Sequence, residues 1–202
     1  MLSIIKPSAA TVAKFLARQS KLDFNYPDVG RTSGGFPRGY DYDRFEVELG
    51  RGEQCFQAAR SAMQSWQHFR VGWVEAVPST TAIVAGNDIA IRANVMGLWA
   101  LAACRIIDVI DECSSSDCRF GYSFGTLPAH PEQGEERFQL VRFADDRVRY
   151  RVTAFFRPNQ LTARLAWSYF RNRFNQFRRQ SAAVMIDLAQ PSTAQKRASP
   201  AA

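Results

Sequence analysis

The last third of the chain ends in a long stretch whose aromatic residues recur with the period of a helix. Between about Gln160 and Met185, one face carries residues at alternating spacings of four and three: Ala163, Trp167, Phe170, Phe174, Phe177 and Ser181. A stripe of this kind has to be buried against an apolar partner. The chain therefore needs a large apolar surface elsewhere, and this need limits the folds that it can adopt.

The sequence predicts that this partner is a sheet. Arg147–Phe156 alternates cleanly, with Tyr150 and Val152 on one face and arginines on the other. In Arg119–Thr126 one face carries Phe120, Tyr122, Phe124 and Thr126. Further strand-like runs are Arg44–Leu49, Ile83–Val84, Asp88–Val95, Leu98–Glu112 and Glu136–Phe143, and an amphipathic helix is expected over Glu53–Phe69. Because short turns join the later strands, we expect an antiparallel sheet.

These elements predict an α+β fold in which a curved antiparallel sheet wraps around the long C-terminal helix. A chain of 202 residues fits one domain with tails. We expect an N-terminal helical segment over 1–20, a single domain over 21–187, and a disordered tail over 188–202 that is poor in apolar residues.

Several motifs along the chain resemble those of the DUF1990 (UPF0548) family. They are FGYSFGTLPAHPEQGEERF at 120–138, FNYPDVG at 24–30, LGRGEQCF at 49–56, the run W-x-x-F-x-x-GW from Trp66 to Trp73, CRIIDVIDE at 104–112 and AFFRP at 154–158. The predicted architecture also resembles the helix-grip fold of the START and pollen-allergen lipid-binding superfamily. The resemblance implies a fold and a family, but no mechanism.

Composition narrows the class of protein. The most apolar stretch, Asn94–Cys104, has 11 residues, too few to span a membrane as a helix. The first ten residues do not read as a signal peptide, so we expect a cytoplasmic protein. Cys113 and Cys118 flank the turn Ser-Ser-Ser-Asp and could face each other across a hairpin, but free thiols are the expectation for a cytoplasmic protein. With two His and no CxxC, a zinc site is not expected, and neither is any cofactor.

The first functional hypothesis is a binding protein for a small apolar or amphipathic molecule, held between the sheet and the C-terminal helix. Its cavity is expected to be lined by Phe120, Tyr122, Phe124, Tyr150, Val152, Trp167 and Phe170. The same large rings could instead fill the core, and the sequence leaves these two alternatives open.

A second hypothesis is an enzyme that acts on such a molecule. His130 and Glu135 are the acid–base candidates, because a histidine titrates near neutrality and carboxylates lie beside it. Thr126, Glu136 and Arg137 belong to the same segment as candidate ligand contacts. The alternative is that these polar groups only satisfy the backbone of a loop rich in Pro and Gly. Asp108 is expected on the face of Ile106 and Ile110, paired across strands with Arg119 or Arg149.

A third hypothesis starts from an uneven distribution of charge. Residues 147–186 contain nine Arg and no Lys, Asp or Glu, whereas the rest of the chain has 17 Lys and Arg against 19 Asp and Glu. This arginine-rich third could bind an anionic partner or a lipid head group. Nucleic acid is the less favoured partner, because the chain shows no recognised nucleic-acid motif.

Overall fold

A computed structural model describes residues 1–159 and 167–190, without the side chain of Trp167. In chain order the helices are α1 (Ala9–Gln19), α2 (Gly52–Gln64) and α4 (Trp167–Ala189). The strands are β1 (Leu2–Ser3), β2 (Asp41–Arg51), β3 (Val74–Val77), β4 (Asp88–Val95), β5 (Leu98–Cys113), β6 (Asp117–Thr126), β7 (Glu132–Phe143) and β8 (Arg147–Pro158). Two single-turn 3₁₀ helices cover Arg31–Ser33 and Gln67–Phe69.

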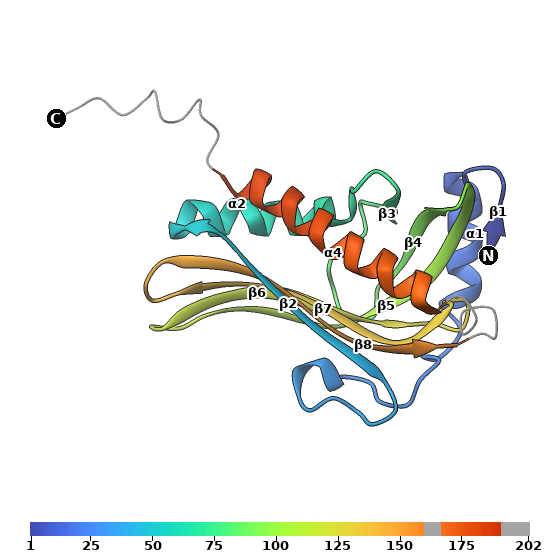
Figure 1. Cartoon of the computed structure of the whole chain (residues 1–202), viewed down its shortest axis with the longest axis horizontal. Coiled ribbons are helices and arrows are strands. Elements are labelled where there is room, and N and C mark those ends of the chain that lie inside the picture. The colour runs from blue at the N-terminus through green and yellow to red at the C-terminus, as the bar shows by residue number, and fades with distance from the viewer. Residues whose placement is uncertain (160–166, 191–202) are drawn as a thin grey trace.

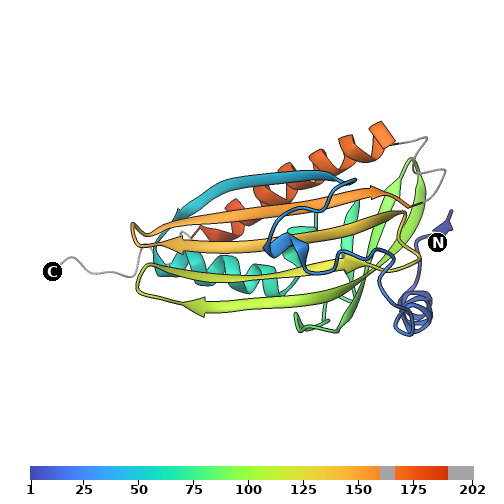
Figure 2. The ribbon, with the colours of Figure 1, turned by 90° about the horizontal axis from the view of Figure 1, so that it is seen from below.

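The strands form one antiparallel sheet in the order β2-β8-β7-β6-β5-β4-β3, with β1 paired to β5. Figure 1 shows the sheet curving beneath α2 and α4, and Figure 2 shows its long strands from the opposite side. The expected helix-grip architecture, a curved antiparallel sheet wrapped around a C-terminal helix, is confirmed. We call the side of the sheet that faces α2 and α4 the inner face, and the opposite side the outer face.

The inner face carries the apolar half of each alternating strand. On β6, β7 and β8 it presents Tyr122, Phe138 and Tyr150, all fully buried, against α2 and the second half of α4. The outer face is partly covered by residues 21–40, which run across it as a long connection (Figure 2). This connection bears the 3₁₀ helix Arg31–Ser33.

The N-terminal segment is attached to the sheet at two places. Ser8 caps α1 by accepting a hydrogen bond from the Thr11 amide at 3.2 Å. The helix then buries Val12 and Phe15 in a small second core. Leu2 and Ser3 pair with β5. Within 1–159 and 167–190, no helix combines the length and the apolar character needed to cross a membrane.

Several element boundaries differ from those expected. The helix over Glu53–Phe69 ends at Gln64, because Trp66 takes a left-handed conformation (φ 56°) that an α-helix cannot continue. Ile83–Val84 is not a strand. The short strand in this region is instead β3, which pairs with β4. At the C-terminus α4 continues to Ala189, beyond the expected boundary at 187, while 160–166 and 191–202 lie outside the described residues.

The expectation of free thiols at Cys113 and Cys118 is wrong. The two residues face each other at the tip of the β5–β6 hairpin, with Cα atoms 4.0 Å apart, and they form a disulfide. The strand register pairs Cys113 directly with Cys118, which confirms that they face each other across the hairpin and brings the two thiols close enough to bond. The other two cysteines, Cys55 and Cys104, are free and buried.

Candidate functional site

Five of the seven residues expected to line a cavity instead fill the centre of the molecule. Phe120, Tyr122, Phe124, Tyr150 and Val152 all lie on the inner face and are at most 5% exposed. Phe177 of α4 packs into the same core, with its ring centroid 5.0 Å from that of Phe69. Beneath the second half of α4, the filled-core alternative therefore describes the packing better than an open cavity does.

Two hydrogen bonds link the polar groups inside this core. The Tyr150 hydroxyl lies 2.9 Å from Ser181 Oγ on α4, and the Tyr122 hydroxyl lies 2.7 Å from Nε2 of His68. His68 is fully buried and its ring stacks on Trp66, while its Nδ1 has no hydrogen-bond partner. Burial lowers the pKa of His68 to about 3, so the ring is neutral at pH 7.

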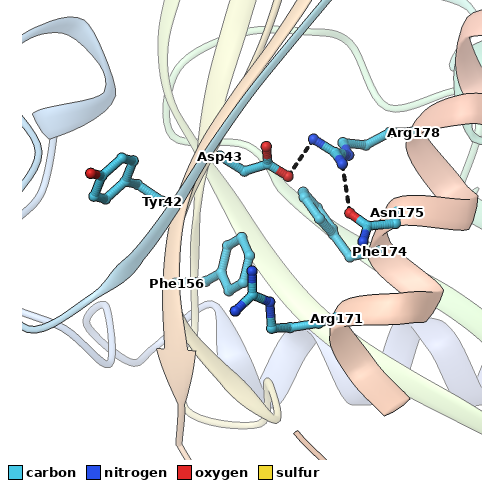
Figure 3. Close-up of a pocket in the computed structure, with 7 residues that line it drawn as sticks. All are labelled: Tyr42, Asp43, Phe156, Arg171, Phe174, Asn175 and Arg178. Atoms are coloured by element: carbon cyan, nitrogen blue, oxygen red, sulfur yellow. Dashed lines mark hydrogen bonds and ion pairs between the residues drawn. The ribbon is translucent and has the colours of Figure 1, made fainter. Parts of the chain in front are cut away.

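A pocket of about 270 Å³ lies beside this core, between β2, β8 and the first half of α4. Figure 3 shows its lining, which combines two rings with charged and amide side chains. The lining residues are Tyr42, Asp43, Phe156, Arg171, Phe174, Asn175 and Arg178. The Tyr42 ring points away to the outer face (Figure 3), where it stacks on Phe36.

Arg178 organises one wall of the pocket. Its guanidinium pairs with the Asp43 carboxylate and donates to Asn175 Oδ1 at 2.5 Å. The same group lies 5.5 Å from the centroid of the Phe174 ring, which itself packs 5.0 Å from Phe156. Arg171 lies nearer to solvent, with Nη1 3.6 Å from the carboxylate of Asp41. The pocket thus offers a ring surface and fixed charges side by side.

Glu136 extends this site across the sheet. The register places Asp43, Ala154 and Glu136 in one row over three neighbouring strands on the inner face. Glu136 Oε1 is buried and has no hydrogen-bond partner.

Burial also perturbs the acids of this row and its neighbourhood. It raises the pKa of Glu136 well above its usual value of 4.5, and the nearby charge of Glu132 adds to the increase. Burial raises the pKa of Glu132 itself to about 7. Both carboxyls thus hold their protons far more readily than carboxyls in water do.

Glu135 points to the opposite face and has a structural environment. Its carboxylate accepts hydrogen bonds from the Tyr26 hydroxyl, the Gly30 amide, and both the amide and the hydroxyl of Thr32. These contacts hold residues 26–32 against the outer face. Thr126 ties the same connection down, because its hydroxyl donates to Asn25 Oδ1 and accepts from the Gly134 amide.

Arg137 lies beside Glu135 on the outer face and pairs with Asp108, whose Oδ2 is 2.6 Å from Arg137 Nη2. The expectation that Asp108 shares a face with Ile106 and pairs with Arg119 or Arg149 is wrong. A β-bulge between Ile106 and Asp108 shifts the register by one residue and turns the carboxylate to the outer face.

His130 occupies the turn between β6 and β7. Its Nδ1 accepts a hydrogen bond from the Glu132 amide at 3.0 Å, and its carbonyl accepts one from the side chain of Asn159. Burial lowers its pKa to about 4. The structure does not bring His130 and Glu135 into a common pocket, since neither lines the pocket of Figure 3 and Glu135 lies under the outer connection.

None of the predicted site residues whose side chains the structure describes lines the pocket. Glu136 shares a row of the sheet with Asp43, and Phe170 lies half-buried on α4 one turn before Phe174. The Trp167 side chain lies outside the described residues. Sequence reasoning missed Asp43, Asn175 and Arg178 as pocket residues. The signal for them was the acidic pattern of β2 facing a basic helix. Within 1–159 and 167–190, no three His, Cys, Asp or Glu side chains gather closely enough to hold a metal ion.

Comparison with known proteins identifies relatives over most of the chain. Residues 25–184 match the family model "Domain of unknown function (DUF1990)". A UPF0548 protein of Dictyostelium discoideum is 30% identical over 190 residues, covering 84% of this chain and 88% of the relative. One from Deinococcus radiodurans is 31% identical over 163 residues, covering 75% and 80%. Among solved structures, hypothetical protein jhp0584 of Helicobacter pylori aligns with a TM-score of 0.53 at 9% identity, covering 83% of this chain and 96% of that one, which shows a shared fold.

Proposed function

This chain belongs to the DUF1990 family of UPF0548 proteins, and from the geometry of its pocket we propose that it binds a small amphipathic molecule between the sheet and α4. The single observation that carries the proposal is the pocket of about 270 Å³ at the inner face. This volume lies just below the range of about 300–1,000 Å³ usual for small-molecule sites. A ligand there would be of metabolite size.

The lining supports an amphipathic rather than a purely apolar ligand. Phe156 and Phe174 provide a ring surface for an apolar body. The charged groups of Asp43, Arg171 and Arg178 are already fixed in position by ion pairs. Small-molecule sites commonly combine an apolar surface with a few placed polar groups in this way.

The packed core beside the pocket supports the same assignment. Phe177, Ser181 and Met185 anchor the second half of α4 by burial, so the first half is held over the pocket from one end. Phe174 and Asn175 in this first half are only partly buried. Because the buried second half of α4 holds the helix in place, its partly exposed first half forms a preformed wall against which a ligand can bind.

The test is native mass spectrometry of protein purified gently from its host, followed by organic extraction of any bound molecule. We expect a reproducible adduct on the wild type. The variant Asn175→Trp should lose it, because the larger side chain fills the pocket. Gln176→Trp, one residue further along the helix and exposed, is the matched control and should keep the adduct.

Two results would count against this function. An adduct that persists equally in Asn175→Trp would place the ligand elsewhere on the protein. A bare mass in repeated wild-type preparations, together with no binding of any small amphipathic probe, would remove the proposal. Circular dichroism of each variant establishes that the comparison is made between folded proteins.

A further inference from the structure

Four acids lie on the inner face of β2 and β7 around the pocket. Asp43 lines the pocket, and Asp41, Glu132 and Glu136 occupy neighbouring positions of the sheet outside its lining. The two pocket arginines are each engaged by an aspartate, Arg171 by Asp41 and Arg178 by Asp43. Among the described residues, no ion pair reaches Glu132 or Glu136. Two acids are therefore left without a basic partner.

Of these two acids, Glu136 has the less favourable environment for a charge. Its Oε1 is shielded from solvent and lacks any hydrogen-bond partner. Burial of an ionised carboxylate without a partner is costly, and native proteins seldom retain such a group without a use for it. On β7, Glu132 and Glu136 share a face, and Gly134 between them contributes no side chain. The space between the two acids is thus free of protein side chains from their own strand.

Resting on the proposed function, we propose that the inner polar group of the ligand is a basic nitrogen that pairs with Glu136. A protonated amine would supply the cation that both acids lack. The aromatic wall formed by Phe156 and Phe174 suits the same group, because cations are attracted to ring faces. The ligand class is thus a small amphipathic amine.

The electrostatics of the site predict that the protein releases a proton when it binds a cationic ligand. The groups that act on Glu136 or respond to its charge come from every strand and helix around it: Glu132, Asp43, Arg178, Cys104, Tyr122 and Tyr150. Burial raises the pKa of Glu132 to about 7, so this acid titrates near neutrality. Because the pKa of Glu136 is raised, a cationic ligand should expel a proton from this pair of acids when it binds.

The experiment is isothermal titration calorimetry with three probes of matched shape: 2-phenylethylamine, 2-phenylethanol and 3-phenylpropanoate. Titrations at pH 6.5 in two buffers of different ionisation enthalpy report the number of protons released. We expect the amine to bind about tenfold or more tightly than the alcohol, with release of close to one proton. The carboxylate should bind more weakly than either.

Variants assign the effect to one residue. Glu136→Gln should weaken amine binding about tenfold or more and reduce proton release, while alcohol binding stays unchanged. Glu48→Gln, the same change on the exposed outer side of β2, should behave like the wild type.

An alcohol or carboxylate that binds as tightly as the amine would overturn the amine assignment and leave the binding function standing. The amine assignment would also be overturned if Glu136→Gln bound the amine with the affinity and proton release of the wild type. Failure of all three probes also overturns the amine assignment, and the adduct experiment then decides the binding function separately.

Discussion

Glu135 and Glu136 are neighbours in the chain with opposite environments. The pleat of β7 sends Glu135 to the outer face, where four donors surround its carboxylate. It sends Glu136 to the inner face, where one oxygen has no partner at all. The first side chain therefore stabilises the fold, whereas the second is retained at a cost to it.

Single substitutions at these two positions should separate the roles. Glu135→Ala should lower the free energy of unfolding by about 2–4 kcal/mol, because it leaves buried donors of Tyr26, Gly30 and Thr32 without an acceptor. Glu136→Ala should leave it unchanged or raise it at pH 7, because no hydrogen bond among the described residues is lost and the cost of burying an ionisable carboxyl is removed. Urea unfolding at pH 7 measures both values. Equal losses at the two positions would contradict this division.

At the scale of elements, the basic third of the chain finds its counterions in β2. Glu46 pairs with both Arg149 and Arg151 of β8, and Asp43 pairs with Arg178 of α4. The charge that stood out in the sequence is thus partly neutralised within the molecule. The hypothesis of an anionic partner on the arginine-rich third gains no support from these arginines, because an acid already occupies each of them.

The pairing between β2 and β8 should depend on salt. Glu46→Gln removes the partner of two arginines and should cost about 1 kcal/mol in dilute buffer and clearly less in 1 M NaCl, because these side chains are about one-third exposed. Chemical unfolding in urea at both salt concentrations gives the two values. Glu48→Gln on the same strand is the control and should cost almost nothing. A Glu46→Gln cost that salt leaves unchanged would show that the contacts act through packing instead.

The elements themselves were largely predictable from periodicity. The alternation in β6 and β8 depends only on which residues are apolar, and it predicts the inner faces of both strands correctly. The stripe of α4 is likewise correct at Phe177 and Ser181, which are buried. Two features depended on tertiary structure and were missed. The bulge at Ile106–Asp108 adds a residue without any signature in the alternation, so Asp108 was assigned to the wrong face. A cavity between the sheet and the C-terminal helix was expected, but the residues that line the pocket were missed, because those on β2 and those on α4 lie more than 120 residues apart in the chain.

The whole molecule buries two kinds of titratable group that respond to pH in opposite directions. Burial lowers the pKa of His68 to about 3 and of His130 to about 4, below their ordinary 6.5. These two favour the unfolded state as the pH falls below 6.5, because the unfolded chain then binds more protons. Burial raises the pKa of Glu132 to about 7 and that of Glu136 well above 4.5. These two destabilise the fold as the pH rises above 4.5, because the unfolded carboxyls ionise first.

Stability should therefore be greatest at mildly acidic pH. Between about 4.5 and 6.5 the two opposing effects nearly cancel, while outside this window each group costs about 1.4 kcal/mol per pH unit until its folded pKa is passed. Urea unfolding from pH 3.5 to 8 should show a plateau near pH 5–6 with a decline on both sides. His68→Gln should reduce the decline on the acid side, and Glu136→Gln the decline on the neutral side. Either change should also tilt the region between pH 4.5 and 6.5, because the two opposing effects then no longer cancel. Stability that keeps rising from pH 5.5 to 8 would contradict the raised pKa values of Glu132 and Glu136. It would also remove the reason to expect a cationic ligand to stabilise the protein most near pH 8.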